Sequence, residues 1–202
     1  MTTAERIMKK KAFIKVEMDR EIGAARSDAL WRAATERLAD IRRAHGELPK
    51  GVRAHTDNYI FPSAAIYLTA ADAVGRQTAY RIVENAAIKK TTAMGRQLAG
   101  LMKLPGMAGL FIRIWDPLTR RMFGASSGFS NVFYPKEKGA YRMDVTACPY
   151  CRYFAELGCP ELTKIFCDND ERGYGNLPGI AFERTGTLGK GADRCDFRIR
   201  KV

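Results

Sequence analysis

Residues 124–150, GASSGFSNVFYPKEKGAYRMDVTACPY, are where a helical sequence gives way to one with the pattern of a β-sheet. Apolar side chains nearly alternate along this stretch, at Phe129, Val132, Phe133, Tyr141, Met143 and Val145. Such alternation is typical of strands that are buried on one face. The segment PKEKG at 135–139 contains proline and glycine and predicts the turn of a β-hairpin between two strands.

The tail of the chain predicts a second pair of strands. IAFERTGTL (180–188) and RCDFRIRKV (194–202) are rich in residues that favour strands, and a glycine-containing turn joins them. Residues 149–158 and roughly 160–174, which lie between the two strand pairs, fit short helices. The C-terminal half is therefore expected to hold about four antiparallel strands and two helices.

The first half of the chain predicts helices. SDALWRAATERLADIRRAHG (27–46) carries an apolar side chain every three or four residues, with Ser27 as its expected N-cap. Residues 48–62 contain proline and glycine and predict a loop. Further helices are expected after this loop, and Pro105 interrupts them.

These patterns predict an α+β fold in which a helical N-terminal half packs with the C-terminal half. We expect a single domain over residues 1–202, mainly helical at 1–124 and both α+β and cysteine-rich at 125–202. The length suits one domain, and 46% apolar residues give ample material for a core.

The sequence predicts a cytoplasmic protein without membrane contact. Its N-terminal segment lacks the continuous apolar stretch of a signal peptide. The most apolar segment, 98–118, is interrupted by Lys103, Pro105, Arg113 and Asp116, and is too broken to span a bilayer. Cytoplasmic thiols are kept reduced, and the odd number of cysteines also argues against a complete set of disulfides.

The net charge of +12 is concentrated in one part of the chain. Residues 81–142 contain eleven Lys or Arg and three acids, which accounts for eight of the twelve excess charges. Such a face could attract nucleic acid, anionic lipid or a carboxylate-bearing substrate. No helix-turn-helix, zinc-finger or RNA-binding signature accompanies the charge, so a solvated basic surface is favoured over nucleic-acid binding.

Cys148 and Cys151 form a Cys-x-x-Cys pair, CPYC, that follows a predicted strand and opens a predicted helix. This is the local geometry of a redox dithiol, but the surrounding sequence lacks the β-α-β pattern of thioredoxin-like proteins. A structural zinc site would supply a second close pair, and the only histidines, His45 and His55, lie far upstream. The sequence therefore favours neither a redox pair nor a zinc knuckle.

A divalent metal is nevertheless left open. Thiolates suit zinc, and if a metal is present its expected ligands are Cys148, Cys151, Cys167 and Cys195. The remaining thiol, Cys159, is expected in the core, because free cysteines are among the most buried residue types.

The tail also contains groups that suit attack on a small electrophile. Cys167 and Cys195 supply thiols, and Asp170 and Asp196 supply carboxylates that can move protons. Arg184 can bind a substrate carboxylate through two hydrogen bonds. A strand with one buried thiol and salt-bridged charges explains the same residues equally well, so the residues alone leave both interpretations open.

Two stretches, DVTACPYCRYFAELGCPELTKIFCDND (144–170) and FERTGTLGKGADRCDFRIRK (182–201), resemble the L-2-amino-thiazoline-4-carboxylic acid hydrolase family. The shared elements are an Asp-x-Thr-x-Cys strand end, a Phe-Cys-x-x-Asp helix, and an Arg-Thr-x-Thr-Leu segment that leads through a glycine turn to Cys-Asp-Phe-Arg. They occur here at Asp144, Thr146, Cys148, Cys167, Asp170, Arg184, Thr185, Thr187, Cys195 and Asp196. Residues 61–83 also resemble the helical half of the family.

The resemblance implies a hydrolase that opens a small cyclic amidine or amide, such as 2-amino-thiazoline-4-carboxylate, by adding water at a C–N bond. It implies Cys167 or Cys195 as the nucleophile, or as the holder of a metal that activates water. Asp170 or Asp196 would be the acid–base group. The residues expected to bind the carboxylate-bearing substrate are Arg184, Thr185, Thr187 and Cys148. The cofactor is left open, a divalent metal included.

The tail TGTLGKGADRCDFRI (185–199) is also distantly similar to 4-vinyl-reductase type small-molecule-binding domains, in which tail cysteines can ligate zinc. Thr187 replaces the first of those cysteines and is a poor zinc ligand, so this similarity implies a small-molecule pocket more than a zinc site. The alternative function is therefore a non-catalytic, sensor-like binding protein of the same fold. Nucleic-acid binding through residues 81–142 is a third function, and a homo-oligomer is left open.

Overall fold

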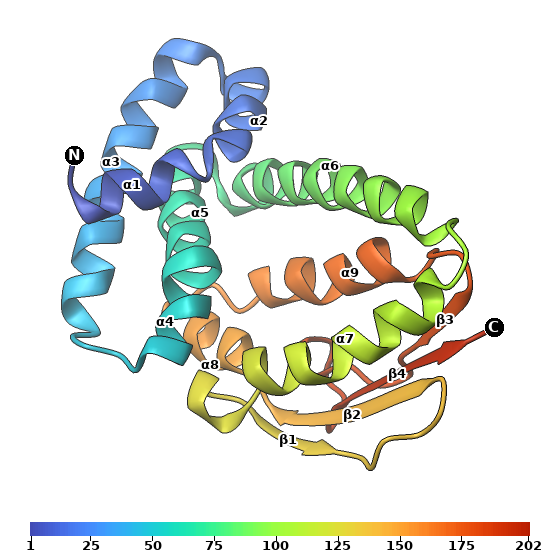
Figure 1. Cartoon of the computed structure of the whole chain (residues 1–202). Coiled ribbons are helices and arrows are strands. Elements are labelled where there is room, and N and C mark those ends of the chain that lie inside the picture. The colour runs from blue at the N-terminus through green and yellow to red at the C-terminus, as the bar shows by residue number, and fades with distance from the viewer. The chain divides into compact units, whose positions relative to one another are not determined.

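The computed structural model describes all 202 residues and has an α+β fold, as predicted (Figure 1). Its α-helices are α1 (Thr3–Lys9), α2 (Ala12–Ile22), α3 (Ala24–Ala44), α4 (Lys50–His55), α5 (Phe61–Val74), α6 (Arg76–Met102), α7 (Met107–Met122), α8 (Pro149–Glu156) and α9 (Leu162–Tyr174). The π-helix η1 (Thr56–Ile60) joins α4 to α5, and η2 (Ala125–Ser127) and η3 (Leu188–Lys190) are 3-10 turns. The strands are β1 (Ser130–Phe133), β2 (Ala140–Ala147), β3 (Ile180–Glu183) and β4 (Cys195–Lys201). None of the helices is both long and apolar enough to cross a membrane.

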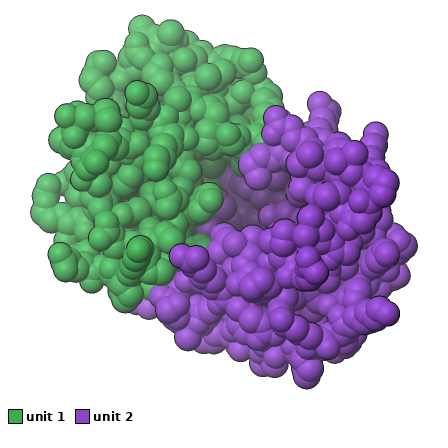
Figure 2. Space-filling model, in the orientation of Figure 1, with its two compact units in different colours: residues 1–90, 153–162 green, residues 91–152, 163–202 purple.

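Two compact units make up the chain, and Figure 2 colours them separately. Unit 1 consists of Met1–Lys90 and Tyr153–Leu162, and unit 2 consists of Thr91–Arg152 and Thr163–Val202. The boundaries fall inside α6, inside α8 and at the start of α9, so the chain passes from one unit to the other three times. The single domain predicted over residues 1–202 stays a prediction.

Helix α5 lies at the centre of unit 1. It is apolar nearly all round, and nine of its residues are buried. Tyr67 is completely buried, and its hydroxyl donates a hydrogen bond to Glu161, which satisfies the polar end of the ring. Glu161 also accepts a hydrogen bond from Arg76 at 2.8 Å. Cys159 is completely buried in this unit, so its predicted place in the core is confirmed.

The loop predicted for residues 48–62 is wrong. Helix α4 and the π-helix η1 run without a break into α5. Buried Val52, Thr56 and Ile60 recur every four residues, which places them on one helical face and gives the segment its core contact. Pro62 has no N–H for the helical ladder, and the wider π-turn immediately before it accommodates this loss.

The N-cap expected at Ser27 is also wrong. Helix α3 begins at Ala24, after Gly23, and Ser27 is completely buried within the first turn. Gly23 has a φ of 81°, a backbone conformation that glycine adopts without a side-chain clash. A change of backbone direction at glycine therefore sets the start of this helix, and no side-chain cap is involved.

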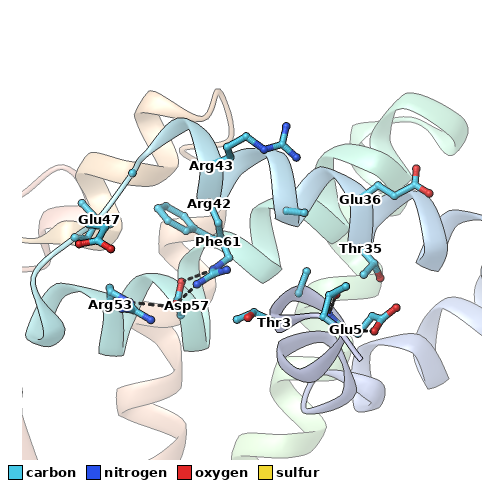
Figure 3. A pocket seen from close by; sticks show the side chains of 15 residues that line it. Thr3, Glu5, Thr35, Glu36, Arg42, Arg43, Glu47, Arg53, Asp57 and Phe61 are labelled. Atoms are coloured by element: carbon cyan, nitrogen blue, oxygen red, sulfur yellow. Dashed lines mark hydrogen bonds and ion pairs between the residues drawn. The ribbon is translucent and has the colours of Figure 1, made fainter.

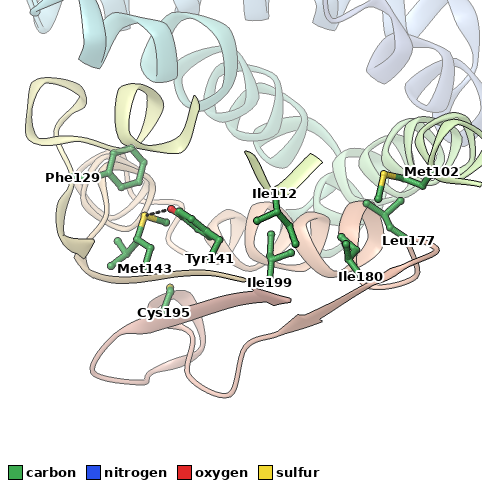
Figure 4. Packing of buried hydrophobic residues seen from close by; sticks show 10 residues of the cluster. Met102, Ile112, Phe129, Tyr141, Met143, Leu177, Ile180, Cys195 and Ile199 are labelled. Atoms are coloured by element: carbon green, nitrogen blue, oxygen red, sulfur yellow. Dashed lines mark hydrogen bonds between the residues drawn. The ribbon is translucent and has the colours of Figure 1, made fainter. Parts of the chain in front are cut away.

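Unit 2 contains a four-stranded antiparallel sheet of order β1-β2-β4-β3, which confirms the four predicted strands. The turn predicted at 135–139 joins β1 to β2, and Phe133 pairs with Met143 beside it. One face of the sheet packs into the core of the unit (Figure 4). The side chains on this inner face include Tyr141, Met143, Val145, Cys195, Phe197 and Ile199.

Helices α7 and α9 contribute to the same core. Helix α7 packs against β2 and β4, and its Ile112 lies in the buried cluster (Figure 4). Helix α9 joins the cluster through Tyr174, whose ring meets that of Trp115 edge-on with centroids 4.7 Å apart. Helix α6 approaches α9 closely at Gly95, where an added Cβ would lie 3.0 Å from the carbonyl oxygen of Arg172.

We expect the two units to unfold together, because α6 and α8 each contain residues of both units. The chain has two tryptophans, Trp31 in unit 1 and Trp115 in unit 2, and each can report on its own unit. In the variants Trp31→Phe and Trp115→Phe, urea unfolding followed by the remaining tryptophan should have the same midpoint as far-UV circular dichroism. Separate midpoints for fluorescence and circular dichroism would contradict a single domain.

Candidate functional site

All of the predicted site residues lie in unit 2, on neighbouring segments of the chain. Cys148 follows β2, Cys151 lies on α8, Cys167 and Asp170 lie on α9, and the others lie in the β3–β4 connection or at the start of β4. Cys167 is close enough to Cys151 and Cys195 for their charges to influence its ionisation. The structure therefore brings the predicted thiols into one region.

Arg184, which follows β3, is almost completely buried, with 1% of its side chain exposed. Its Nη1 donates a hydrogen bond to Asp170 at 2.9 Å. Its Nη2 donates to Glu171 and to the carbonyl oxygen of Cys167, both at 2.8 Å. All three acceptors belong to α9, so this one guanidinium ties the end of β3 to that helix.

Arg184 is predicted to bind the carboxylate of the substrate, but two carboxylates of the protein already bind its guanidinium. Both Nη atoms are held by the protein's own carboxylates, and the buried Nε is the one donor without a partner. A substrate carboxylate would have to bind Nε or displace Glu171, which is 50% exposed and therefore the more easily moved of the two acids. This role of Arg184 stays a prediction.

Cys167 and Asp170 are three residues apart on α9, so their side chains share one side of the helix. Burial raises the pKa of Cys167 to about 12, and the thiol is neutral at pH 7. Burial also raises the pKa of Asp170 to about 6, although Arg184 opposes the change. Asp170 keeps 35% of its side chain exposed. A carboxyl group with a pKa near neutrality can both accept and give a proton.

Asp196 holds a turn of the chain. Its carboxylate accepts hydrogen bonds from the backbone N–H groups of Thr185 and Gly186 and from the Thr185 hydroxyl. Burial opposes ionisation, but these hydrogen bonds outweigh it and lower the pKa of Asp196. Consecutive strand residues point to opposite faces, so Asp196 lies on the outer face of the sheet while Cys195 is buried in the core. We do not expect these two side chains to act on the same substrate atom.

The β3–β4 connection lies directly against α9. Gly189 makes this contact possible, because an added Cβ would lie 2.7 Å from Thr163 Cγ2 and 2.8 Å from Cys167 Sγ. Thr187 is buried and precedes the 3-10 turn of the same loop. A backbone N–H of this turn donates a hydrogen bond to Cys195 Sγ at 3.2 Å. The loop therefore contacts both of the predicted nucleophiles.

Cys148 and Cys151 form a hydrogen-bonded pair at the start of α8. The Cys148 thiol donates to Cys151, which lowers the pKa of Cys151 to about 7 and raises that of Cys148. Both side chains are partly exposed and neither is in a disulfide. Cys151, predicted only as a conditional metal ligand, is thus the thiol that ionises most readily. Its place in the first turn of a helix, where N–H groups favour negative charge, is a signal that the sequence already contained.

No group of three or more His, Cys, Asp and Glu side chains has an arrangement that could hold a metal ion. The conditional ligands Cys148, Cys151, Cys167 and Cys195 therefore share a region without forming such a group.

A cavity of about 640 Å³ lies in unit 1 (Figure 3). The predicted site residues belong to unit 2. In its wall Arg42 and Arg53 both donate to Asp57, at 3.0 and 3.4 Å. A second cavity of about 290 Å³ lies in unit 2, between α7 and the β1–β2 turn. None of the predicted site residues lines either cavity.

A loop over residues 48–62, as the sequence predicts, gives no reason for Arg53 and Asp57 to face one another, so the sequence does not predict the cavity of unit 1. In the helical conformation that the structure has there, Arg53 and Asp57 stand four residues apart and pair on one face. The spacing of these opposite charges is the feature of the sequence that could have indicated a helix here.

A comparison with protein families agrees with the resemblance in the tail. The family model described as L-2-amino-thiazoline-4-carboxylic acid hydrolase matches residues 53–199. This range covers most of the chain and contains every predicted site residue. A search of curated proteins and a search of solved structures found no match.

Removing the Arg184 guanidinium should lower stability. Arg184→Ala loses three hydrogen bonds to α9, so the free energy of unfolding should fall by about 2–4 kcal/mol. Arg198→Ala is the matched control on the same sheet, because Arg198 is 53% exposed and its ion pair with Glu183 is 4.0 Å long. That variant should lose less than about 1 kcal/mol. Chemical denaturation measures both, and equal losses would contradict the tie between β3 and α9.

Cys151 should be the first thiol to react with iodoacetamide. The thiolate is the nucleophile, so the rate should rise as pH increases through about 7, the pKa of Cys151, and then level off. Cys167 and Cys195 should stay unmodified near neutrality, because burial raises their pKa. Peptide mass spectrometry after short pulses gives each rate. Cys148→Ala, which removes the thiol that donates to Cys151, should move the profile to higher pH, and faster labelling of Cys167 would refute the assignment.

Proposed function

The chain belongs to the L-2-amino-thiazoline-4-carboxylic acid hydrolase family, and on this premise we propose that it is a hydrolase that opens a small cyclic amidine or amide. Water is added at a C–N bond, and 2-amino-thiazoline-4-carboxylate is the substrate to test first. The observation that carries this proposal is the family match over residues 53–199.

Cys167 with Asp170 is the best supported of the predicted thiol–carboxylate pairs. The two residues share one side of α9, whereas Cys195 and Asp196 point to opposite faces of the sheet. Arg184 holds both members of the first pair, through the Asp170 carboxylate and the Cys167 carbonyl oxygen. We assign attack on the electrophilic carbon to Cys167 and proton transfer to Asp170.

The neutral Cys167 thiol must lose its proton when it attacks. Asp170 can accept that proton, since a pKa of about 6 leaves it largely ionised at pH 7. A cationic amidinium group beside Cys167 would assist, because a nearby positive charge lowers the pKa of a thiol. Asp170 then gives the proton to the leaving nitrogen of the ring, and water releases the product from the thiol.

Asp196 is a positioning residue in this proposal. It fixes the turn after β3 through its hydrogen bonds to Thr185 and Gly186. The same loop carries Gly189 against Cys167. Asp196 therefore holds the β3–β4 loop in place beside Cys167 without touching the reacting atoms.

Purified protein incubated with 2-amino-thiazoline-4-carboxylate should yield a product that is heavier by one water, which mass spectrometry detects. Cys167→Ser and Asp170→Asn should each lower turnover by at least about a hundredfold. Cys195→Ser is the matched thiol control, and its turnover should change little. Circular dichroism of each variant checks that a lost activity is not a lost fold.

Two results would contradict parts of the proposal. Turnover of Cys167→Ser at the wild-type rate would rule out Cys167 as the nucleophile. Binding of the compound by the folded wild-type protein without any turnover would instead favour a non-catalytic, sensor-like protein of the same fold.

A further inference from the structure

Cys148 and Cys151 have no part in the thiol chemistry assigned above, yet the structure holds them together as a pair. We propose that these two residues form a reversible intramolecular disulfide, which makes CPYC (148–151) a redox-responsive site. The oxidant is a low-molecular-weight disulfide such as glutathione disulfide.

The turn between β2 and α8 sets the spacing of the two thiols. Strand β2 ends at Ala147 and α8 begins at Pro149, so Cys148 immediately precedes the helix and Cys151 lies in its first turn. Both thiols are free and partly exposed, and they lie close enough together for each to shift the pKa of the other. A disulfide needs β-carbons about 4 Å apart. Pro149 restricts the backbone between the two cysteines at the first helical position.

Cys151 is also the thiol of the chain that ionises most readily. The pKa of Cys151 is lowered to about 7, and its side chain is partly exposed. Cys159 is completely buried, and burial raises the pKa of Cys167 and Cys195. A dissolved disulfide therefore meets one accessible thiolate, and the thiol hydrogen-bonded to it is the natural resolving group.

The reaction proceeds by two thiol–disulfide exchanges. The Cys151 thiolate attacks one sulfur of glutathione disulfide, which forms a mixed disulfide and releases one glutathione thiolate that takes up a proton. Cys148 then loses its proton and attacks the Cys151 sulfur, which releases the second glutathione as a thiol. The protein dithiol loses two electrons and two protons, and glutathione disulfide gains them.

One consequence rests on the proposed function. Cys148 is one of the predicted substrate-binding residues, so forming the disulfide would change substrate binding at the proposed site. The disulfide itself needs no turnover, and its formation is measured by mass alone. A failure of the hydrolase proposal would therefore leave this inference untouched.

The test uses the full chain, reduced and then exposed to glutathione disulfide at about pH 6.5, with alkylation to stop the reaction. Intact mass and peptide mapping should show a loss of two hydrogens, located at Cys148 and Cys151 and reversed by dithiothreitol. Cys148→Ser should stop at one glutathione adduct on Cys151, and Cys151→Ser should form neither product. Cys195→Ser should behave as the wild type does.

A comparison with unfolded protein separates the folded geometry from mere sequence proximity. At about pH 6.5 a thiol with a pKa near 7 should exchange about tenfold faster than one at its ordinary value of 9.0, after allowing for its lower intrinsic nucleophilicity. The first exchange should therefore be about tenfold faster in the folded chain than in urea. Equal rates, no disulfide in the wild type, or first adducts on Cys167 or Cys195 would each overturn the proposal.

Discussion

The buried guanidinium of Arg184 joins the strand and helix layers of unit 2. It reaches from the end of β3 to three acceptors on α9, and the rings of Phe182 and Phe197 lie 5.9 and 5.2 Å from it. A buried cation that lost these partners would be strongly destabilising, so α9 cannot slide along the sheet without a large loss of free energy. Helix α9 also carries Cys167 and Asp170, and their placement under the β3–β4 loop therefore depends on this one cation.

Local patterns in the sequence predicted those parts of the fold that local forces decide. The alternation within residues 124–150 and the similar pattern in the tail predicted all four strands, because it records which side chains face the core. Residues 48–62 were predicted as a loop because proline and glycine usually end helices. Burial of Val52 and Ile60 against the rest of unit 1 outweighs that preference, and a short window of sequence does not contain this contribution.

Some features of the candidate site could likewise be predicted from the sequence, and others depend on packing. Strand alternation already implied that Cys195 and Asp196 point to opposite faces, so this separation could have been predicted. The two acids that bind Arg184 lie 14 and 13 residues away in the sequence on another element, and only packing brings them to it. The raised pKa of Cys167 could not be predicted either, because it depends on burial that only packing creates, whereas the place of Cys151 at the start of a helix could be read from the sequence.

The sheet of unit 2 ends on both sides in its two shortest strands. Strands β1 and β3 have four residues each, and the longer β2 and β4, with eight and seven residues, lie between them. An outer strand exposes backbone N–H and C=O groups that can recruit a strand from another molecule, and short outer strands limit this recruitment. The order of strands thus acts against cross-β aggregation, because the sheet offers little template for fibril growth.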